Sequence, residues 1–151
     1  MSKGYVLGER SLDRLVGIDP KLVAVIKRAI EITEVDFTIV EGVRTLARQR
    51  QLVASGASQT LSSKHITGDA VDLGAWIDGT ISWDEKYYYD IADSMRIAAM
   101  ELGVAVRWGG CWLGDIRHFT SSKEALDKYK SVRKSQGRKV FLDLVHFELL
   151  D

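Results

Sequence analysis

The stretch Ser63–Asp72 carries the residues of this chain that are best suited to metal chemistry. It places His65 and Asp72 seven positions apart, on either side of Gly68. An imidazole nitrogen and a carboxylate oxygen are both good zinc ligands. Thr67-Gly68 is typical of a turn, because glycine adopts backbone angles that other residues avoid. We therefore expect His65 before the turn and Asp72 after it to converge on one ion.

A third ligand must come from elsewhere in the chain. The two other histidines are His118 and His146, and His146 lies in the segment Asp143–Leu149 near the C-terminus. Two histidines, one carboxylate and an open fourth position describe a catalytic zinc site, whereas a structural zinc has four protein ligands.

These segments resemble the zinc peptidases of the D-alanyl-D-alanine carboxypeptidase (VanY-like) group, which have Ser-x-His-(x)6-Asp followed by Asp/Glu-x-x-His. The chain is more similar still to the L-alanyl-D-glutamate peptidase endolysins of tailed phages. The similar segments stand in the family's order within residues 10–112 and 141–150, and they are Asp36–Thr45, Ser63–Asp72, Trp76–Trp83, Arg107–Gly110 and Asp143–Leu149.

The resemblance implies a complete zinc site and a catalytic acid. It places the Zn²⁺ ligands at His65, Asp72 and His146, and the general acid/base at Asp143. A regular strand conflicts with this, because residues 143 and 146 would face opposite sides and Asp143 would be buried as an unpaired charge. Either the chain turns near Asp143, or Glu148, on the same face as His146, is the base. We favour the turn, because the resemblance places the acid at Asp143.

Arg44 and Ser63 are the expected substrate-binding residues. Arg44 follows a predicted strand, Phe37–Val40, and precedes a predicted helix over residues 46–55, and its guanidinium could bind a carboxylate bidentately. From spacing alone a surface arginine is the simpler interpretation, but the family has a substrate-binding arginine at this junction. Ser63 ends a polar loop over residues 56–64, and we expect it to donate a hydrogen bond to substrate or to support the metal ligands.

No internal repeat or low-complexity linker divides the chain, which predicts a single α+β domain over residues 1–151. The resemblance implies a small, mainly antiparallel sheet with helices packed on one side. Asp19-Pro20 is a helix start, since aspartate caps and proline suits the first turn. A long helix is expected over residues 84–102, with a buried stripe of Tyr87, Ile91, Met95, Ala98 and Leu102. Trp76–Trp83 predicts a hairpin around Asp-Gly, whose tryptophans line a cleft or, more commonly, pack on the core.

The chain departs from the family after Trp108-Gly109-Gly110. Cys111 stands where the family has an aspartate, and residues 113–139 form an atypical basic insertion. Lys123–Lys139 holds seven basic and two acidic residues, a local excess of five positive charges. Ser121-Ser122-Lys123-Glu124 is typical of a capping box, which predicts a helix over residues 122–134. The insertion is either a solvated helix or an electrostatic contact to an anionic polymer such as peptidoglycan or lipopolysaccharide.

Two further residues could carry chemistry but have simpler interpretations. His118 lies in the insertion, and a solvated or packed histidine is a simpler interpretation of it than a metal ligand. Cys111 would need a base partner to act as a nucleophile, and the sequence identifies none.

Bulk composition excludes several classes of protein. The chain is 46% hydrophobic and 28% charged, which is ordinary for a globular domain. Its 21 basic and 21 acidic residues cancel, so no overall field directs it to nucleic acid or membrane. One cysteine excludes an internal disulfide. No segment approaches the apolar length of a membrane span, and Met1–Arg10 lacks the apolar run of a signal peptide.

The leading hypothesis is a zinc-dependent endopeptidase that cleaves the L-alanyl-D-glutamate bond of the peptidoglycan stem peptide, as a phage endolysin. It would be a monomer with no nucleic-acid partner and no membrane insertion. It would wait in the host cytoplasm until a separate holin opens the way to the periplasm. The alternatives are a D,D-carboxypeptidase or dipeptidase acting on D-Ala-D-Ala, and a zinc-binding wall module without catalysis. An acid at residue 143 together with a ligand at residue 146 argues against the module.

Overall fold

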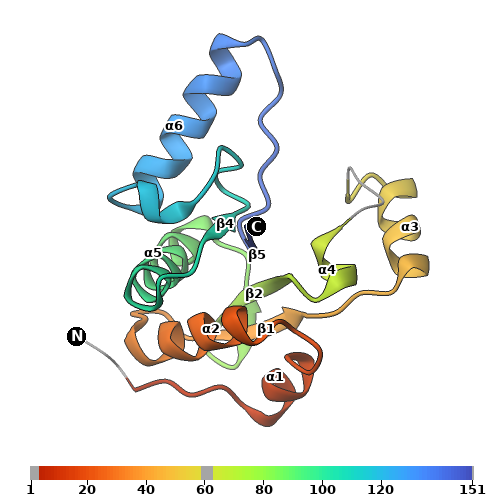
Figure 1. The fold of residues 1–151 in the computed structure, drawn as a ribbon, viewed down its shortest axis with the longest axis vertical. Coiled ribbons are helices and arrows are strands. Elements are labelled where there is room, and N and C mark those ends of the chain that lie inside the picture. The colour runs from red at the N-terminus through yellow and green to blue at the C-terminus, as the bar shows by residue number, and fades with distance from the viewer. Residues whose placement is uncertain (1–3, 59–62, 151) are drawn as a thin grey trace.

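The computed structural model describes residues 4–58 and 63–150, and Figure 1 shows its course. The helices described are α1 (Glu9–Arg14), α2 (Pro20–Ile32), α3 (Leu46–Ala54), α4 (Lys64–Thr67), α5 (Glu85–Leu102), the 3-10 helix η1 (Ile116–His118) and α6 (Ser122–Ser135). The strands are β1 (Phe37–Glu41), β2 (Ala70–Ile77), β3 (Thr80–Ser82), β4 (Val106–Trp108) and β5 (His146–Leu149). Of the polar loop expected over residues 56–64, residues 59–62 lie outside the described part of the chain.

The described strands form an antiparallel sheet, as the sequence predicts. Its order is β1-β2-β5-β4, and β3 folds back on β2 as a hairpin. Asp78, with φ 51°, and Gly79, with φ 80°, make the tight turn of that hairpin. The late strand β5 lies between β2 and β4, which places Asp72 directly opposite His146.

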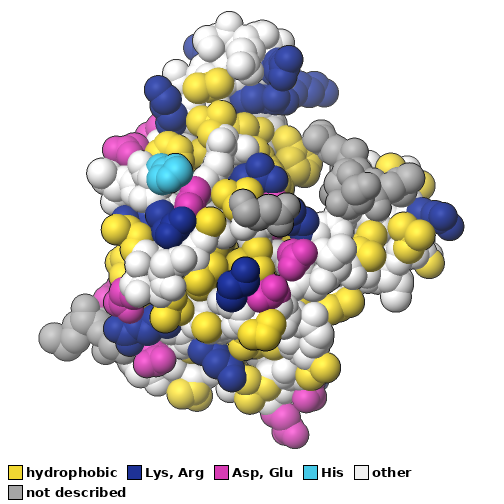
Figure 2. Space-filling model, viewed as in Figure 1, with side chains coloured by type: hydrophobic (Ala, Val, Ile, Leu, Met, Phe, Trp, Pro, Cys, Tyr) yellow, Lys and Arg dark blue, Asp and Glu magenta, His cyan; other side chains and the backbone are white. Residues whose placement is uncertain are grey.

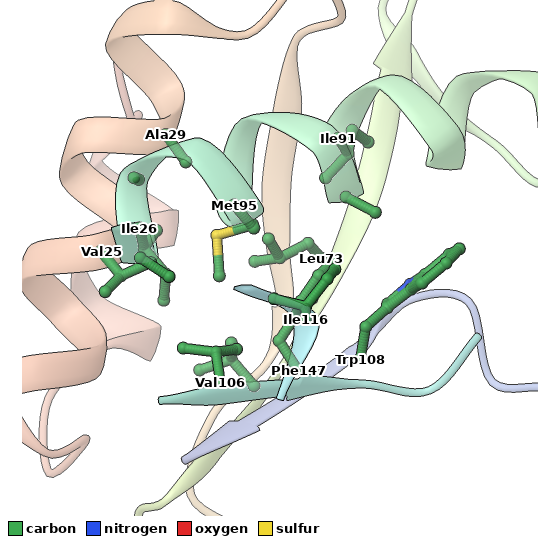
Figure 3. Close-up of a cluster of buried hydrophobic side chains, with 14 of the residues drawn as sticks. Val25, Ile26, Ala29, Leu73, Ile91, Met95, Val106, Trp108, Ile116 and Phe147 are labelled. Carbon is green, nitrogen blue, oxygen red and sulfur yellow. The ribbon is translucent and has the colours of Figure 1, made fainter. Parts of the chain in front are cut away.

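Helices α2 and α5 pack on each other and on one face of the sheet, so the predicted α+β arrangement is confirmed. Figure 3 shows Ile26 of α2 and Met95 of α5 directed toward the sheet side chains Leu73, Val106 and Phe147. Burying a large apolar side chain contributes about 1.5–3 kcal/mol relative to leaving it exposed. This core supports the strands that carry Asp72 and His146.

Side-chain caps explain where two of the helices begin. Asp19 Oδ1 accepts the backbone N–H two residues later at 2.8 Å, and Pro20 occupies the first turn of α2. At α6, Ser121 Oγ accepts the backbone N–H of Glu124 at 3.1 Å. The Glu124 carboxylate accepts the N–H of Thr120, one residue before the cap, at 3.0 Å. The helix predicted over residues 122–134 is therefore α6.

Two details of burial differ from the sequence prediction. In α5, Leu102 is 46% exposed in the last turn and Tyr87 is half-buried, whereas Tyr88 is buried. In the hairpin, Trp76 and Trp83 are 41% and 64% exposed, so the expected packing on the core is wrong. Side chains alternate along a strand, and because Ala75 faces the core, Trp76 points to the other side.

Candidate metal centre and active-site cleft

His65, Asp72 and His146 come together as a buried cluster of metal-ligating side chains. His65 Nε2 lies 3.2 Å from Asp72 Oδ1 and 3.2 Å from His146 Nδ1. The third edge, from His146 Nδ1 to Asp72 Oδ1, measures 3.4 Å. Ligand atoms about 2.0–2.1 Å from a tetrahedral zinc are about 3.3–3.4 Å apart. The three atoms therefore have the spacing of one face of a zinc coordination tetrahedron.

Short local elements bring these side chains together. Ser63 Oγ accepts the N–H of His65 at 3.2 Å and begins α4. Gly68, with φ 81°, ends α4 and returns the chain into β2. This is the turn that the sequence predicts between His65 and Asp72. Antiparallel pairing of β2 with β5 then brings His146 across from Asp72.

Hydrogen bonds on the far side of each imidazole determine which nitrogen faces the cluster. His65 Nδ1 donates to the Gly42 carbonyl at 3.0 Å, and His146 Nε2 donates to Glu148 Oε1 at 2.7 Å. A neutral imidazole has one N–H, so the inner nitrogens carry lone pairs whenever both rings are neutral, as metal binding requires. Asp72 Oδ1 is buried and accepts no hydrogen bond from the described residues. Three lone-pair donors that face one point fit a zinc ion.

The charges around the cluster also favour a cation. Burial lowers the pKa of His146, but Asp72 and Glu148 raise it to about 9. Burial opposes ionisation of Asp72, yet His146 and His65 hold the pKa of its carboxyl below the usual range. The cluster is thus negative enough to hold a positive charge, which is a proton in the metal-free protein.

Asp143 reaches the site through a turn, as the sequence analysis favours. The backbone N–H of His146 donates to the Asp143 carbonyl at 3.0 Å and closes a β-turn just before β5. The turn removes the strand alternation that would direct Asp143 away from His146. Burial raises the pKa of the Asp143 carboxyl, and Asp72 raises it further, against smaller opposing effects of the cationic neighbours. A carboxyl with a raised pKa is suited to proton transfer near neutral pH.

Gly109 fixes the position of this turn. Its N–H donates to the His146 carbonyl at 2.8 Å, and its carbonyl accepts the N–H of Asp143 at 2.9 Å. A Cβ atom at residue 109 would lie 2.0 Å from the Asp143 carbonyl oxygen. Only glycine allows the two backbones to approach this closely. The Trp-Gly-Gly motif therefore positions Asp143.

Glu148, the alternative base, is held in a network of cations. Its Oε1 accepts from His146 Nε2, and its Oε2 accepts from Arg107 Nη2 at 2.7 Å and lies 3.7 Å from Lys64 Nζ. Burial raises the pKa of Glu148, but the hydrogen bonds from His146 and Arg107 lower it to about 2. A carboxylate so fixed orients its histidine partner and is poorly suited to exchange protons near neutral pH. The sequence indicated the contact between His146 and Glu148, because residues two apart on a strand lie on the same face.

Arg44 is buried beside the cluster, and three of its five N–H donors are engaged within the protein. Nε and Nη2 donate to the two carboxylate oxygens of Glu41 at 2.6 and 2.9 Å, and Nη1 donates to Gln49 Oε1 at 2.6 Å. Nη2 also lies 3.7 Å from Asp72 Oδ2. Gln49, fully buried on α3, also donates to Ser58 Oγ at 2.8 Å. Sequence analysis missed Gln49, because one glutamine in a polar helix carries no chemical signal of its own.

The cluster lies in a cleft of about 730 Å³, with Leu52 of α3 and residues 57–58 on one side and residues of α6 and its flanking segments on the other. Figure 1 shows these helices on opposite sides of β2 and β5. Arg44, Ser63 and Asp143, which the sequence singled out, line the cleft together with the metal-ligating residues. The wall on the α6 side is lined by Trp112, Leu113, Tyr129, Val132, Arg133, Gln136, Arg138 and Phe141.

His118 and Cys111 lie apart from this chemistry. His118 is exposed on η1 and is absent from the metal-ligating cluster and from the cleft lining. Cys111 is buried, and burial raises the pKa of its thiol. A thiol with a raised pKa is a poor nucleophile.

Fold and site together define a class: an α+β domain whose antiparallel sheet carries a candidate two-histidine, one-aspartate metal centre at the base of a cleft. A family model, that of the phage L-alanyl-D-glutamate peptidases, matches residues 3–150. The chain belongs to this family, as the resemblance of its motifs implies.

Individual relatives agree with this assignment. The L-alanyl-D-glutamate peptidase of Escherichia phage T5 is 38% identical over 112 residues, which are 72% of this chain and 82% of the relative. That of Listeria phage A118 is 36% identical over 80 residues, 53% of this chain and 27% of the relative.

A solved structure extends the comparison to the fold. The L-Ala D-Glu endopeptidase ChiX of Serratia marcescens has a TM-score of 0.74 at 38% identity, covering 96% of this chain and 90% of that chain. With this coverage, part of residues 113–139 is shared with that structure. Among the described helices of this chain, none combines the length and apolarity needed to cross a bilayer.

Proposed function

We propose that the protein is a zinc-dependent endopeptidase that hydrolyses the L-alanyl-D-glutamate bond of peptidoglycan stem peptides, as a phage endolysin. The observation that carries the proposal is the triangle of lone-pair donors on His65, Asp72 and His146, beside Asp143 in a cleft. Family membership and the printed activities of the phage and Serratia relatives support the choice of bond.

The proposed roles follow from the contacts of each residue. Zinc, when bound, polarises the scissile carbonyl and lowers the pKa of a water molecule. His65, Asp72 and His146 fix its position, and Glu148 fixes the ring of His146. The Asp143 carboxylate takes the proton released by the attacking water and passes it to the leaving amine.

Substrate contacts are proposed for Ser63 and Arg44. The Ser63 oxygen accepts the N–H of His65, so its own hydrogen remains to donate into the cleft. The Arg44 guanidinium is presented in a fixed plane by Glu41 and Gln49. A D-glutamate carboxylate of the substrate is a natural partner for that cation. In the cell, a monomer of this kind would depend on a separate holin to reach periplasmic peptidoglycan.

Digestion of purified peptidoglycan with the zinc-loaded protein tests the reaction. Mass spectrometry of the products should reveal new N-terminal D-glutamate. Release of free D-alanine alone would identify a D,D-carboxypeptidase instead. Binding to the wall without any new terminus would identify a non-catalytic module.

Metal analysis tests the zinc centre separately. The wild-type protein should hold one zinc per chain, and His65→Ala and His146→Ala should lose it. His118→Ala is the matched control, because it makes the same change at an exposed histidine outside the cluster. Full zinc content in both cluster variants would overturn the assignment.

A further inference from the structure

The cationic side chains of the cleft fall into two groups. The lining includes Arg44, Lys64, Arg107, Arg133 and Arg138. Those near the metal centre are paired with carboxylates of the protein. Arg44 pairs with Glu41, whereas Arg107 and Lys64 both contact Glu148. Their charges are largely compensated within the protein.

Arg133 and Arg138, on the α6 side, differ from that group. Within residues 4–58 and 63–150, no acidic side chain forms an ion pair with either one. Arg133 Nε donates to the Lys139 carbonyl at 2.7 Å, which anchors the guanidinium at one corner. Its two terminal nitrogens donate to none of the described residues, so they remain available as a planar fork. Such a fork matches the geometry of a carboxylate.

The end of α6 brings the two arginines together. Gly137, with φ 66°, donates to the Lys134 carbonyl at 3.1 Å, and the N–H of Arg138 donates to the Arg133 carbonyl at 2.9 Å. This is a Schellman motif, which reverses the chain with glycine in the left-handed conformation. Both arginines line the cleft, Arg133 half-buried on α6 and Arg138 exposed just after it, whereas Lys128 and Lys134 of α6 are exposed and absent from the lining. Figure 2 shows Lys and Arg side chains gathered over this end of the molecule.

Aromatic residues line the cleft between the metal centre and α6. The Trp112 ring lies 5.3 Å from the His146 ring, centroid to centroid, and Trp112 Nε1 donates to the Phe141 carbonyl at 3.0 Å. The Tyr129 hydroxyl accepts the N–H of Phe141 at 3.2 Å, which ties the returning chain to α6. These aromatic residues and Arg133 line the same cleft as the metal centre, so a peptide bound there has a path toward Arg133.

We infer that Arg133 and Arg138 form a carboxylate-binding subsite, which holds the stem peptide by a carboxylate beyond D-glutamate, remote from the scissile bond. The inference rests on the proposed peptidase function and gives its substrate a second anchor. It also distinguishes two of the seven basic residues of Lys123–Lys139 from the others, by their place in the cleft. A bidentate contact between charged groups is worth about 1.5–3 kcal/mol, about ten-fold or more in affinity.

The test compares two double variants that each remove two positive charges from this region, R133Q/R138Q and K128Q/K134Q. Each is assayed on a synthetic stem peptide and on the same peptide with the carboxylates beyond D-glutamate amidated. R133Q/R138Q should raise KM for the free peptide at least ten-fold with kcat within two-fold. K128Q/K134Q should match the wild type, and the amidated peptide should not distinguish the three proteins.

Four results would overturn the inference. The first is an equal rise in KM in both double variants, which would indicate net charge alone. The second is an unchanged KM in R133Q/R138Q, and the third is an equal rise in KM on the amidated peptide. The fourth is inhibition by inorganic phosphate that R133Q/R138Q abolishes while KM stays constant. The last would assign the arginines to a phosphate polymer.

A wild-type protein that cleaves neither peptide would contradict the proposed function, not the subsite. Calorimetric binding of the same peptides then decides the subsite. R133Q/R138Q should weaken binding of the free peptide about ten-fold and leave binding of the amidated peptide unchanged. Equal affinities of the wild type and R133Q/R138Q for the free peptide would reject the subsite. Thermal unfolding of both double variants checks that the fold is retained.

Discussion

Glu148 Oε1 accepts a 2.7 Å hydrogen bond from His146 Nε2, so one strand supplies both a candidate metal ligand and the carboxylate that orients it. Residues two apart on a strand share a face, which makes this contact a direct product of β5. Arg107 and Lys64 hold the carboxylate from the other side. The network favours a role for this second acid in orienting the ligand histidine over a role in the reaction.

Glu148→Gln should weaken zinc binding by about ten- to hundred-fold, the usual effect of losing a carboxylate behind a ligand histidine. Glutamine keeps the size of the side chain but removes the negative charge that makes His146 a stronger metal ligand. Competition with a chromophoric chelator measures the affinity. Wild-type zinc affinity combined with complete loss of activity would instead make Glu148 the catalytic base.

Asp143→Asn should retain zinc and lose activity by about two orders of magnitude or more, the scale of acid–base catalysis. The change preserves the β-turn, because the turn uses the backbone carbonyl of Asp143 and not its carboxyl. Single-turnover hydrolysis and metal content, measured on the same sample, separate the two effects. Activity within a few-fold of wild type would remove Asp143 from the reaction.

Arg44→Lys should lower kcat/KM by about ten-fold or more through KM, because lysine lacks the fork that contacts Glu41 and Gln49 together. Zinc affinity should stay near wild type if Arg44 binds substrate. Arg48→Lys on the exposed side of α3 is the control. A fall in zinc affinity without a change in KM would show that Arg44 supports Asp72 and makes no substrate contact.

Gly109→Ala should destabilise the fold by about 1–3 kcal/mol, the usual cost of overpacking, and should also reduce activity by displacing Asp143. The added Cβ would meet the Asp143 carbonyl oxygen at 2.0 Å and the Asp143 Cβ at 3.0 Å. Denaturant unfolding measures the stability. Gly8→Ala is a matched control, since a Cβ there meets no heavy atom within 4 Å. Equal behaviour of the two variants would mean that the turn accommodates the methyl group.

Residue chemistry made the centre of the site predictable. Few residue types bind zinc, and His65 and Asp72 flank a glycine that had to be a turn. Periodicity and caps also located the long helices, because apolar residues four positions apart, such as Ile91 and Met95, fall on one face of a helix. The resemblance implied a mainly antiparallel sheet, but the order β1-β2-β5-β4 was not predicted, since strand pairing is a long-range property.

Directions of side chains were not predictable from the chain alone. Arg133 and Lys128 are alike in sequence, and only the position of α6 and the reversal after it place one in the cleft and the other in solvent. Gln49 acquires its role from the burial of Arg44, which no local pattern encodes. Helix α4 is too short to show periodicity, so only its flanking turn was expected.

The interior position of β5 has a consequence for biosynthesis. Strands β2 and β4 leave the ribosome well before residues 146–149, yet each pairs with β5 and not with the other. A nascent chain that stops short of His146 lacks both the middle of its sheet and one of three metal-binding side chains. Sheet closure and assembly of the metal-binding cluster therefore both require β5, and neither can be complete before residues 146–149 are available to pair.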